Sequence, residues 1–239
     1  MSNRRIPIII AHQGAARPGS HPENTVAAFR RARSVASDWV ELDVRRTADA
    51  ETAVHHDAHL ADGRLIVALP RHELPPLVPD LDQALAACVG MGVNVEIKNF
   101  VGEPDCDPTH WLSHAVVDAA RRADPPVSIL VSSFNIDAID RVHALAPTLP
   151  TALLTLVLGE PAATIAQCAA RGHRALHPFD TTVDRALVDA AHERGLAVNV
   201  WTVDQPDRIA ALARMGVDGI CTNVPDLARR VFESIGLES

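Results

Sequence analysis

The sequence predicts an α/β fold, a (β/α)8 TIM barrel with a small insertion over the mouth at the carboxyl ends of its strands. Three observations lead to this fold: the length of 239 residues, the alternation of short apolar runs with amphipathic segments, and an apolar fraction of 47% that contains almost no aromatic residues. Barrels of this kind use about 250 residues and fill their interior with branched aliphatic side chains. We therefore expect residues 1–239 to form a single domain.

Short apolar runs and helical patterns follow one another along the chain, as parallel α/β structure requires. The candidate strands cover residues 6–11, 39–44, 52–55, 93–97, 128–132, 151–157, 175–177, 197–203 and 219–221. The candidate helices cover residues 24–35, 81–89, 108–122, 136–144, 162–171, 183–194 and 206–214. The repeated order of strand, helix and strand predicts right-handed crossovers.

Nine candidate strands are one too many for the barrel. The length of the connection that precedes each strand identifies the extra one. The connection before residues 52–55 is too short for a helical crossover, which needs about ten residues. We expect this run to return antiparallel and to bring His56 back to the mouth that Asp43 reaches. An open doubly wound sheet is the alternative, but the segment AHQGAARPG lacks the GxGxxG spacing which that fold favours.

The segment of about residues 58–80 departs from the alternation of strands and helices. It contains DGR and LPRHELPPLVP, is rich in proline and shows little periodicity. We expect this segment to form a short insertion or lid over the mouth.

Composition restricts the partners and the compartment. A net charge of −8 argues against a nucleic-acid partner, which would require a basic surface. The four cysteines form no CxxC pair and are expected to be reduced thiols. No apolar run approaches the ~18 residues of a membrane span, and the first run is too short for a signal peptide. We expect a cytoplasmic protein without stable membrane insertion, and the sequence leaves its oligomeric state open.

Acidic residues end two of the predicted strands. Glu41 and Asp43 are two positions apart and therefore share one face of their strand, and Glu96 ends another strand. Strand ends meet at one mouth of the barrel, where three hard oxygen ligands suit a divalent cation, Mg²⁺ or Ca²⁺. The alternative is that these acids are solvated or are paired with Arg45 and Lys98.

Two histidines also fall at strand ends. His12 and His56 could act as a general acid and base on a phosphodiester, although a hydrogen-bonded core histidine is the alternative for each. His55 would face away from His56, and Asp57 directly follows His56 and could orient its imidazole.

Four further polar or aromatic residues also have structural interpretations. Asn24 or Thr25 could cap a helix. Lys98 could hold a phosphate oxygen or pair with Glu96. Trp201 could form a wall of a polyol pocket or simply pack in the core.

The ordered motifs HxG, PENT, ELDV, HD, EIK, SSFN, WTV and DGI-T resemble the glycerophosphodiester phosphodiesterase family from Pro7 to about Asp226. The resemblance implies a (β/α)8 barrel with a small insertion and a divalent cation, Mg²⁺ or Ca²⁺. It assigns metal binding to Glu41, Asp43 and Glu96, catalysis to His12 and His56, and substrate binding to Gln13, Glu23, Asn24, Lys98 and Trp201.

The resemblance also implies a reaction, the hydrolysis of a small-molecule glycerophosphodiester to sn-glycerol 3-phosphate and an alcohol. Another diester, such as a lysophospholipid or an inositol or sugar phosphodiester, is an alternative substrate, and a ligand-binding homologue without turnover is an alternative function. Gln13 stands where the family usually has the arginine of HRG, so a fixed charge is lost unless Arg17 or Arg45 replaces it. The run LADGRLI replaces the family's L-x-R-T-T and predicts an open mouth.

Overall fold

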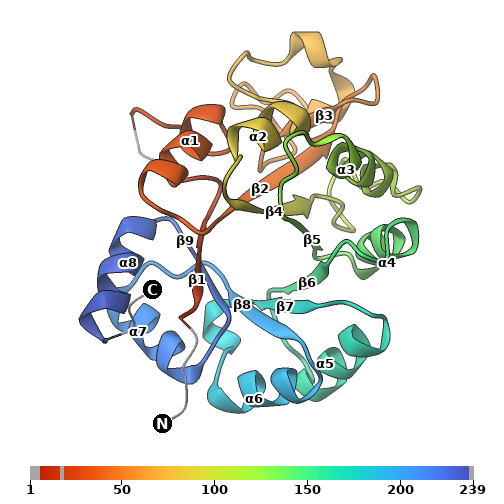
Figure 1. Ribbon diagram of the computed structural model, residues 1–239. Coiled ribbons are helices and arrows are strands. Elements are labelled where there is room, and N and C mark those ends of the chain that lie inside the picture. The colour runs from red at the N-terminus through yellow and green to blue at the C-terminus, as the bar shows by residue number, and fades with distance from the viewer. Residues whose placement is uncertain (1–5, 17–18, 237–239) are drawn as a thin grey trace.

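A computed structural model of the chain describes residues 6–16 and 19–236. Eight parallel strands form a closed ring, because β1 pairs with both β2 and β9. Figure 1 looks along the barrel axis and shows the helices packed around the outside of this ring. The ring contains β1 (Ile8–Ala11), β2 (Trp39–Arg46), β4 (Gly92–Ile97), β5 (Ile129–Ser133), β6 (Thr151–Thr155), β7 (Ala175–Pro178), β8 (Ala197–Val200) and β9 (Gly219–Thr222). The (β/α)8 barrel predicted from the sequence is confirmed.

The ninth strand lies outside the ring, as its short connection predicted. Strand β3 (Thr52–Val54) runs antiparallel to the end of β2, with Val54 opposite Val44. The backbone amide of His55 then donates to the carbonyl of Asp43 at 3.0 Å. This hairpin brings the following residue, His56, back to the mouth of the barrel.

Helices connect successive barrel strands and cover the ring. They are α1 (Val26–Ser34), α2 (Leu81–Ala87), α3 (Trp111–Arg122), α4 (Ile136–Leu145), α5 (Pro161–Ala170), α6 (Arg185–Glu193), α7 (Pro206–Met215) and α8 (Pro225–Ser234). Thr25 caps α1 by accepting from the amide of Ala28, so the capping role falls to Thr25 and not to Asn24. No helix in the described ranges is both long and apolar enough to cross a lipid bilayer.

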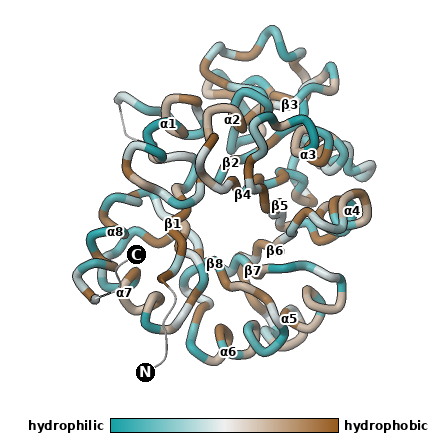
Figure 2. Tube along the Cα trace, in the orientation of Figure 1, coloured by the Kyte–Doolittle hydropathy of each residue, from teal (hydrophilic) through white to brown (hydrophobic). Residues whose placement is uncertain are grey.

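Aliphatic side chains fill the space between strands and helices. The barrel strands are buried almost throughout, and Figure 2 shows hydrophobic stretches along β1 and β5. The segment between β3 and α2 contains two short 3₁₀ turns, Ile66–Ala68 and Arg71–Glu73. It packs around a small core of its own, made by Ala53, Leu60, Ile66, Leu74 and Val78. Burial of these apolar side chains holds the insertion against the β2–β3 hairpin.

Candidate active site

Three carboxylates meet beside the middle of β2 and the carboxyl end of β4. Glu41 and Asp43 project from β2, and Glu96 lies on β4 directly opposite Asp43 in the strand register. A ligand oxygen from each carboxylate lies within 4.8 Å of the others, and all three residues are buried. The parallel register of the barrel therefore gathers the acids that the sequence places on two separate strands.

Burial and mutual repulsion alter the pKa values of these acids. Burial, with Asp43 and Glu96 nearby, raises the pKa of Glu41 well above its ordinary value. Burial and the charge of Asp43 raise the pKa of Glu96 to about 7. Burial would also raise the pKa of Asp43, but Lys98, His56 and Asn24 outweigh burial, so the pKa falls. Two of the three acids are therefore costly to ionise unless a cation lies among them.

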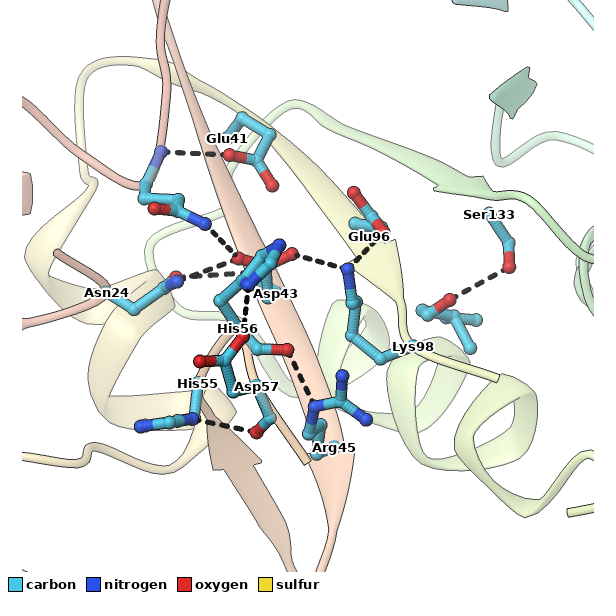
Figure 3. A network of polar contacts seen from close by, with 12 residues as sticks. Asn24, Glu41, Asp43, Arg45, His55, His56, Asp57, Glu96, Lys98 and Ser133 are labelled. Carbon is cyan, nitrogen blue, oxygen red and sulfur yellow. Dashed lines mark hydrogen bonds and ion pairs between the residues drawn. The ribbon is translucent and has the colours of Figure 1, made fainter. Parts of the chain in front are cut away.

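A single lysine offsets part of this negative charge. The Nζ atom of Lys98 lies 2.9 Å from Oε1 of Glu96 and 3.5 Å from Oδ1 of Asp43, as Figure 3 shows. Burial lowers the pKa of Lys98, but the two carboxylates outweigh burial and raise it above its ordinary value. Lys98 is thus held as a cation beside the acids. The pair with Glu96 drawn from the sequence is present, and the contact of Lys98 with a phosphate oxygen stays a prediction.

The residues present fit a divalent cation. Oε1 of Glu41 is buried and has no hydrogen-bond partner among the described residues. A buried carboxylate oxygen without a partner costs several kcal/mol, unless a ligand satisfies it. The donors are carboxylate oxygens, which suit Mg²⁺ or Ca²⁺. Glu41, Asp43 and Glu96 would hold such an ion.

Gln13 and Asn24 fix the carboxylates from the side of β1. Both residues have a left-handed backbone, with φ of 51° and 55°. The amide of Gln13 donates to Oε2 of Glu41 at 2.8 Å. The side-chain amides of Gln13 and Asn24 both donate to Oδ2 of Asp43, at 2.9 and 2.8 Å. Gln13 therefore orients Asp43 with a neutral group, and its contact with substrate stays a prediction.

A hydrogen-bonded chain determines which nitrogen of His12 faces the cavity. The side-chain amide of Asn223 donates to Asp204 at 2.7 Å, so its oxygen is free to accept from Nδ1 of His12 at 2.8 Å. His12 then carries its proton on Nδ1. Its Nε2 lies 4.0 Å from Oε2 of Glu41 and has a free lone pair. No motif predicted Asp204 behind His12, because the two residues lie far apart in the chain.

His56 is fixed in a similar way. Its Nδ1 lies 2.8 Å from Oδ1 of Asp57, the contact that the sequence predicted. Behind it, the buried guanidinium of Arg45 donates to the carbonyl of His56 at 2.8 Å and to Glu103 and Asp105 at 2.9 and 2.6 Å. Arg45 is therefore occupied in joining the His56 loop to the loop after β4. It does not replace the missing arginine at position 13, and Arg17 lies outside the described residues.

A cavity of about 210 Å³ unites these groups at the mouth. Its lining contains seven residues that the sequence singled out: His12, Glu41, Asp43, His56, Glu96, Lys98 and Trp201. The indole of Trp201 donates to the carbonyl of His177 at 2.8 Å and keeps its ring at the wall. Glu23 is exposed and, with Asn24, lines a neighbouring groove that also reaches His56. Phe134 lies in the SSFN motif but was not among the predicted site residues, and it lines the cavity beside Trp201.

Comparison with known proteins adds independent evidence. The sequence model of the "Glycerophosphoryl diester phosphodiesterase family" matches residues 12–227. A glycerophosphodiester phosphodiesterase of Bacillus altitudinis is 27% identical over 251 positions, which cover 95% of this chain and 98% of the relative. One from Caldanaerobacter subterraneus is 29% identical and covers 92% of this chain and 95% of the relative.

Solved structures agree with these relatives. One of them is an Oleispira antarctica phosphodiesterase in complex with the product sn-glycerol-3-phosphate. It superposes with a TM-score of 0.85 at 25% identity, and the match covers 95% of this chain and 97% of that chain. A glycerophosphodiester phosphodiesterase from Parabacteroides distasonis shares the fold, with a TM-score of 0.86 at 24% identity over 98% of this chain and 99% of that chain. The fold, the converging acids and the match over most of the sequence lead to one conclusion: the chain belongs to the glycerophosphoryl diester phosphodiesterase family.

Proposed function

We propose that the protein hydrolyses glycerophosphodiesters to sn-glycerol 3-phosphate and an alcohol, with the help of a divalent cation. The observation that carries the proposal is a single cavity that contains three buried acids, one lysine and two histidines. Family membership supports it, as does the Oleispira antarctica relative, whose complex contains sn-glycerol-3-phosphate. The substrate is a small molecule, since a net charge of −8 disfavours nucleic acid.

The phosphate end of the substrate lies between the lysine and the position where the acids would hold the cation. Glu41, Asp43 and Glu96 would bind this ion, which would withdraw electrons from a phosphoryl oxygen and offset the charge that develops on it. The Nζ atom of Lys98 lies beside two of these acids and donates to a second phosphoryl oxygen. Gln13 and Asn24 keep the Asp43 carboxylate in one orientation throughout the reaction.

The two histidines move the protons. Each presents Nε2 to the cavity, because the Nδ1 of His12 is bonded to Asn223 and that of His56 to Asp57. One imidazole accepts a proton from the attacking hydroxyl, which belongs to water or to the glycerol, and the other donates a proton to the departing alkoxide. Trp201 forms an apolar wall for the glycerol carbons, and Glu23 contacts the substrate from the groove beside His56.

The proposal extends to the chain as a whole. The closed ring uses strands from Ile8 to Thr222, which supports one catalytic domain over residues 1–239. All four cysteines are free thiols, which agrees with a reducing compartment such as the cytoplasm.

The direct test is turnover of glycerophosphocholine by the purified protein, with choline and sn-glycerol 3-phosphate measured separately. We expect activity with Mg²⁺ or Ca²⁺ and none in EDTA. His12→Asn and His56→Asn should each lower kcat by about 10²–10⁴-fold, the usual contribution of a general acid or base. Undiminished activity in EDTA would refute the role of the cation. Binding of sn-glycerol 3-phosphate without turnover of any diester would show a ligand-binding homologue instead of an enzyme.

A further inference from the structure

Exposed apolar side chains are concentrated beside the active site. Among the described residues, five large hydrophobic side chains are exposed, and four of them lie on two loops at the mouth. Phe100 and Val101 follow β4 and are 50% and 74% exposed, and Leu156 and Val157 follow β6 and are 56% and 77% exposed. Single exposed hydrophobic residues are common, but a group at the edge of a cavity is typical of a binding surface.

These loops border a second cavity that adjoins the active site. It measures about 190 Å³ and is lined on its apolar side by Phe100, Phe134 and Leu156. Its remaining wall includes Glu96 and Lys98, which also line the active-site cavity, as do Phe134 and Leu156. Each cavity alone is smaller than the ~300 Å³ at which ligand pockets usually begin, but the two together reach that size.

A row of aromatic rings connects the two cavities. Phe179 contacts Trp201 with ring centroids 5.2 Å apart, Trp201 contacts Phe134 at 5.5 Å, and Phe134 contacts Phe100 at 5.9 Å. All three contacts are edge-to-face, the arrangement that aromatic pairs prefer. The row therefore extends from the proposed glycerol wall at Trp201 to the half-exposed ring of Phe100, and it offers an apolar surface along its whole length.

We propose that the apolar subsite formed by Phe100, Phe134 and Leu156 binds a fatty acyl chain carried by the glycerol of the substrate. The preferred substrate class is then a monoacyl glycerophosphodiester, a lysophospholipid, and not the fully deacylated diester. This inference rests on the proposed function. We assign the acyl chain to the glycerol because Phe134 and Leu156 line the same cavity as Trp201, the proposed glycerol wall. The groove beside His56 has apolar side chains as well, such as Leu60 and Leu77, but it reaches neither Trp201 nor the aromatic row.

The reaction on such a substrate needs no additional reagent. The bond between phosphorus and the oxygen of the head-group alcohol breaks, and water supplies the hydroxyl that remains on phosphorus. The other proton of water passes by way of the histidines to the departing alcohol. The acyl ester is unchanged, so the products are a monoacylglycerol phosphate and the free alcohol.

The test compares glycerophosphocholine with monoacyl glycerophosphocholines that carry four, six or eight acyl carbons, used as monomers, with choline release as the readout. Full burial of a methylene stabilises a complex by about 0.8 kcal/mol, so we expect kcat/KM to rise about two- to four-fold per added carbon until the subsite is filled. Values of kcat/KM that do not change with chain length would overturn the inference. The absence of turnover on every substrate would overturn the proposed function with it.

Three variants test where the acyl chain of the substrate binds. Phe100→Ser should reduce the ratio of kcat/KM for the eight-carbon substrate to that for glycerophosphocholine by roughly ten-fold, the loss of two buried methylenes or more. Val157→Ser should reduce it less, because Val157 lies on the rim outside both cavities. Leu77→Ser is the matched control, since Leu77 is 63% exposed but lies on the insertion, and the ratio should not change.

Other results would assign a different role to the exposed apolar side chains Phe100, Val101, Leu156 and Val157. Leu77 lines the groove beside His56. A fall in the kcat/KM ratio for Leu77→Ser but not for Phe100→Ser would place the acyl chain in that groove and contradict the inference. A gain confined to the octyl ester of sn-glycerol 3-phosphate would place the chain on the leaving alcohol and would contradict it too. Sedimentation with phosphatidylcholine vesicles, together with no dependence on chain length for monomeric substrates, would identify a membrane contact instead.

Discussion

The carboxylate of Glu41 is placed for function at the expense of stability, and replacing it by glutamine should show this directly. Glu41→Gln keeps the shape of the side chain, and its amide oxygen can still accept from the backbone amide of Gln13. The substitution removes a charge that lies among Asp43 and Glu96. We expect the variant to be more stable than the wild type without metal, and to lose most of the stabilisation that metal provides.

The separation of the acids sets the size of this effect. At 4.8 Å, the upper limit between their ligand oxygens, two carboxylates repel each other by about 3 kcal/mol in a medium of effective dielectric constant about 20. Relief of one such repulsion should raise the Tm of a chain of this size by about 6–12 °C, at roughly 2–4 °C per kcal/mol. Protonation of Glu41 achieves the same relief, because burial and its neighbours raise its pKa. The gain should therefore shrink at acidic pH.

Thermal unfolding followed by circular dichroism, in EDTA at pH 8 and pH 5.5, measures this difference. Saturating Mg²⁺ or Ca²⁺ should raise the Tm of the wild type and should have little effect on Glu41→Gln. Asp57→Asn is a suitable control, because Asp57 is exposed and lies outside the acid cluster. A Tm for Glu41→Gln below that of the wild type in EDTA at pH 8 would refute the argument that the buried carboxylates repel one another.

Three further predictions concern residues around the site. Burial lowers the pKa of His177 to about 3 from 6.5, so the unfolded chain binds the proton more readily and stability falls as pH falls below 6.5. His177→Gln should remove about 2 kcal/mol from the stability difference between pH 8 and pH 5, measured by urea unfolding in EDTA. Arg45→Met should lower kcat more than it raises KM, because the carbonyl of His56 loses its hydrogen-bond donor. Arg45→Lys should restore only part of kcat, because a lysine cannot contact the His56 carbonyl and Asp105 at once as the planar guanidinium does. Asn223→Leu should lower kcat and alter its pH profile, because the Nδ1 proton of His12 loses its acceptor; an unchanged profile would contradict the deduced tautomer.

The fold could be predicted because its signals are local and repeated. Each strand is a short buried run. The short connection before residues 52–55 excluded that run from the ring, and the structure forms it as β3, Thr52–Val54. Element boundaries were less accurate, since α3 begins at Trp111 rather than at residue 108. Asp107 accepts from the amides of Thr109 and Trp111 and delays the helix. Helix α8 had no predicted range, although Pro225 at its first turn and its amphipathic pattern were available signals.

The convergence of the acids could be predicted for a different reason. In a parallel barrel the carboxyl ends of all strands share one rim, so Glu41, Asp43 and Glu96 must approach one another. The contacts that orient them could not be predicted, because they depend on the direction of single side chains. Asn24 is an example: its left-handed backbone turns the side chain from the helix cap to Asp43. The network of Arg45 depends in the same way on a loop whose course the sequence does not reveal.

The neutral residue at position 13 is consistent with the charge balance of the site. Glu41, Asp43, Glu96 and Lys98 together carry a net charge of −2 when ionised, which a divalent cation neutralises. In the proposed reaction a phosphodiester brings one further negative charge, which the protonated imidazole of the general acid balances. An arginine at position 13 would add a positive charge next to Asp43 and compete with the cation for that carboxylate. Gln13 avoids this competition because its amide donates to Asp43 without adding charge, and in the proposed mechanism the cation and Lys98 then recognise the phosphate.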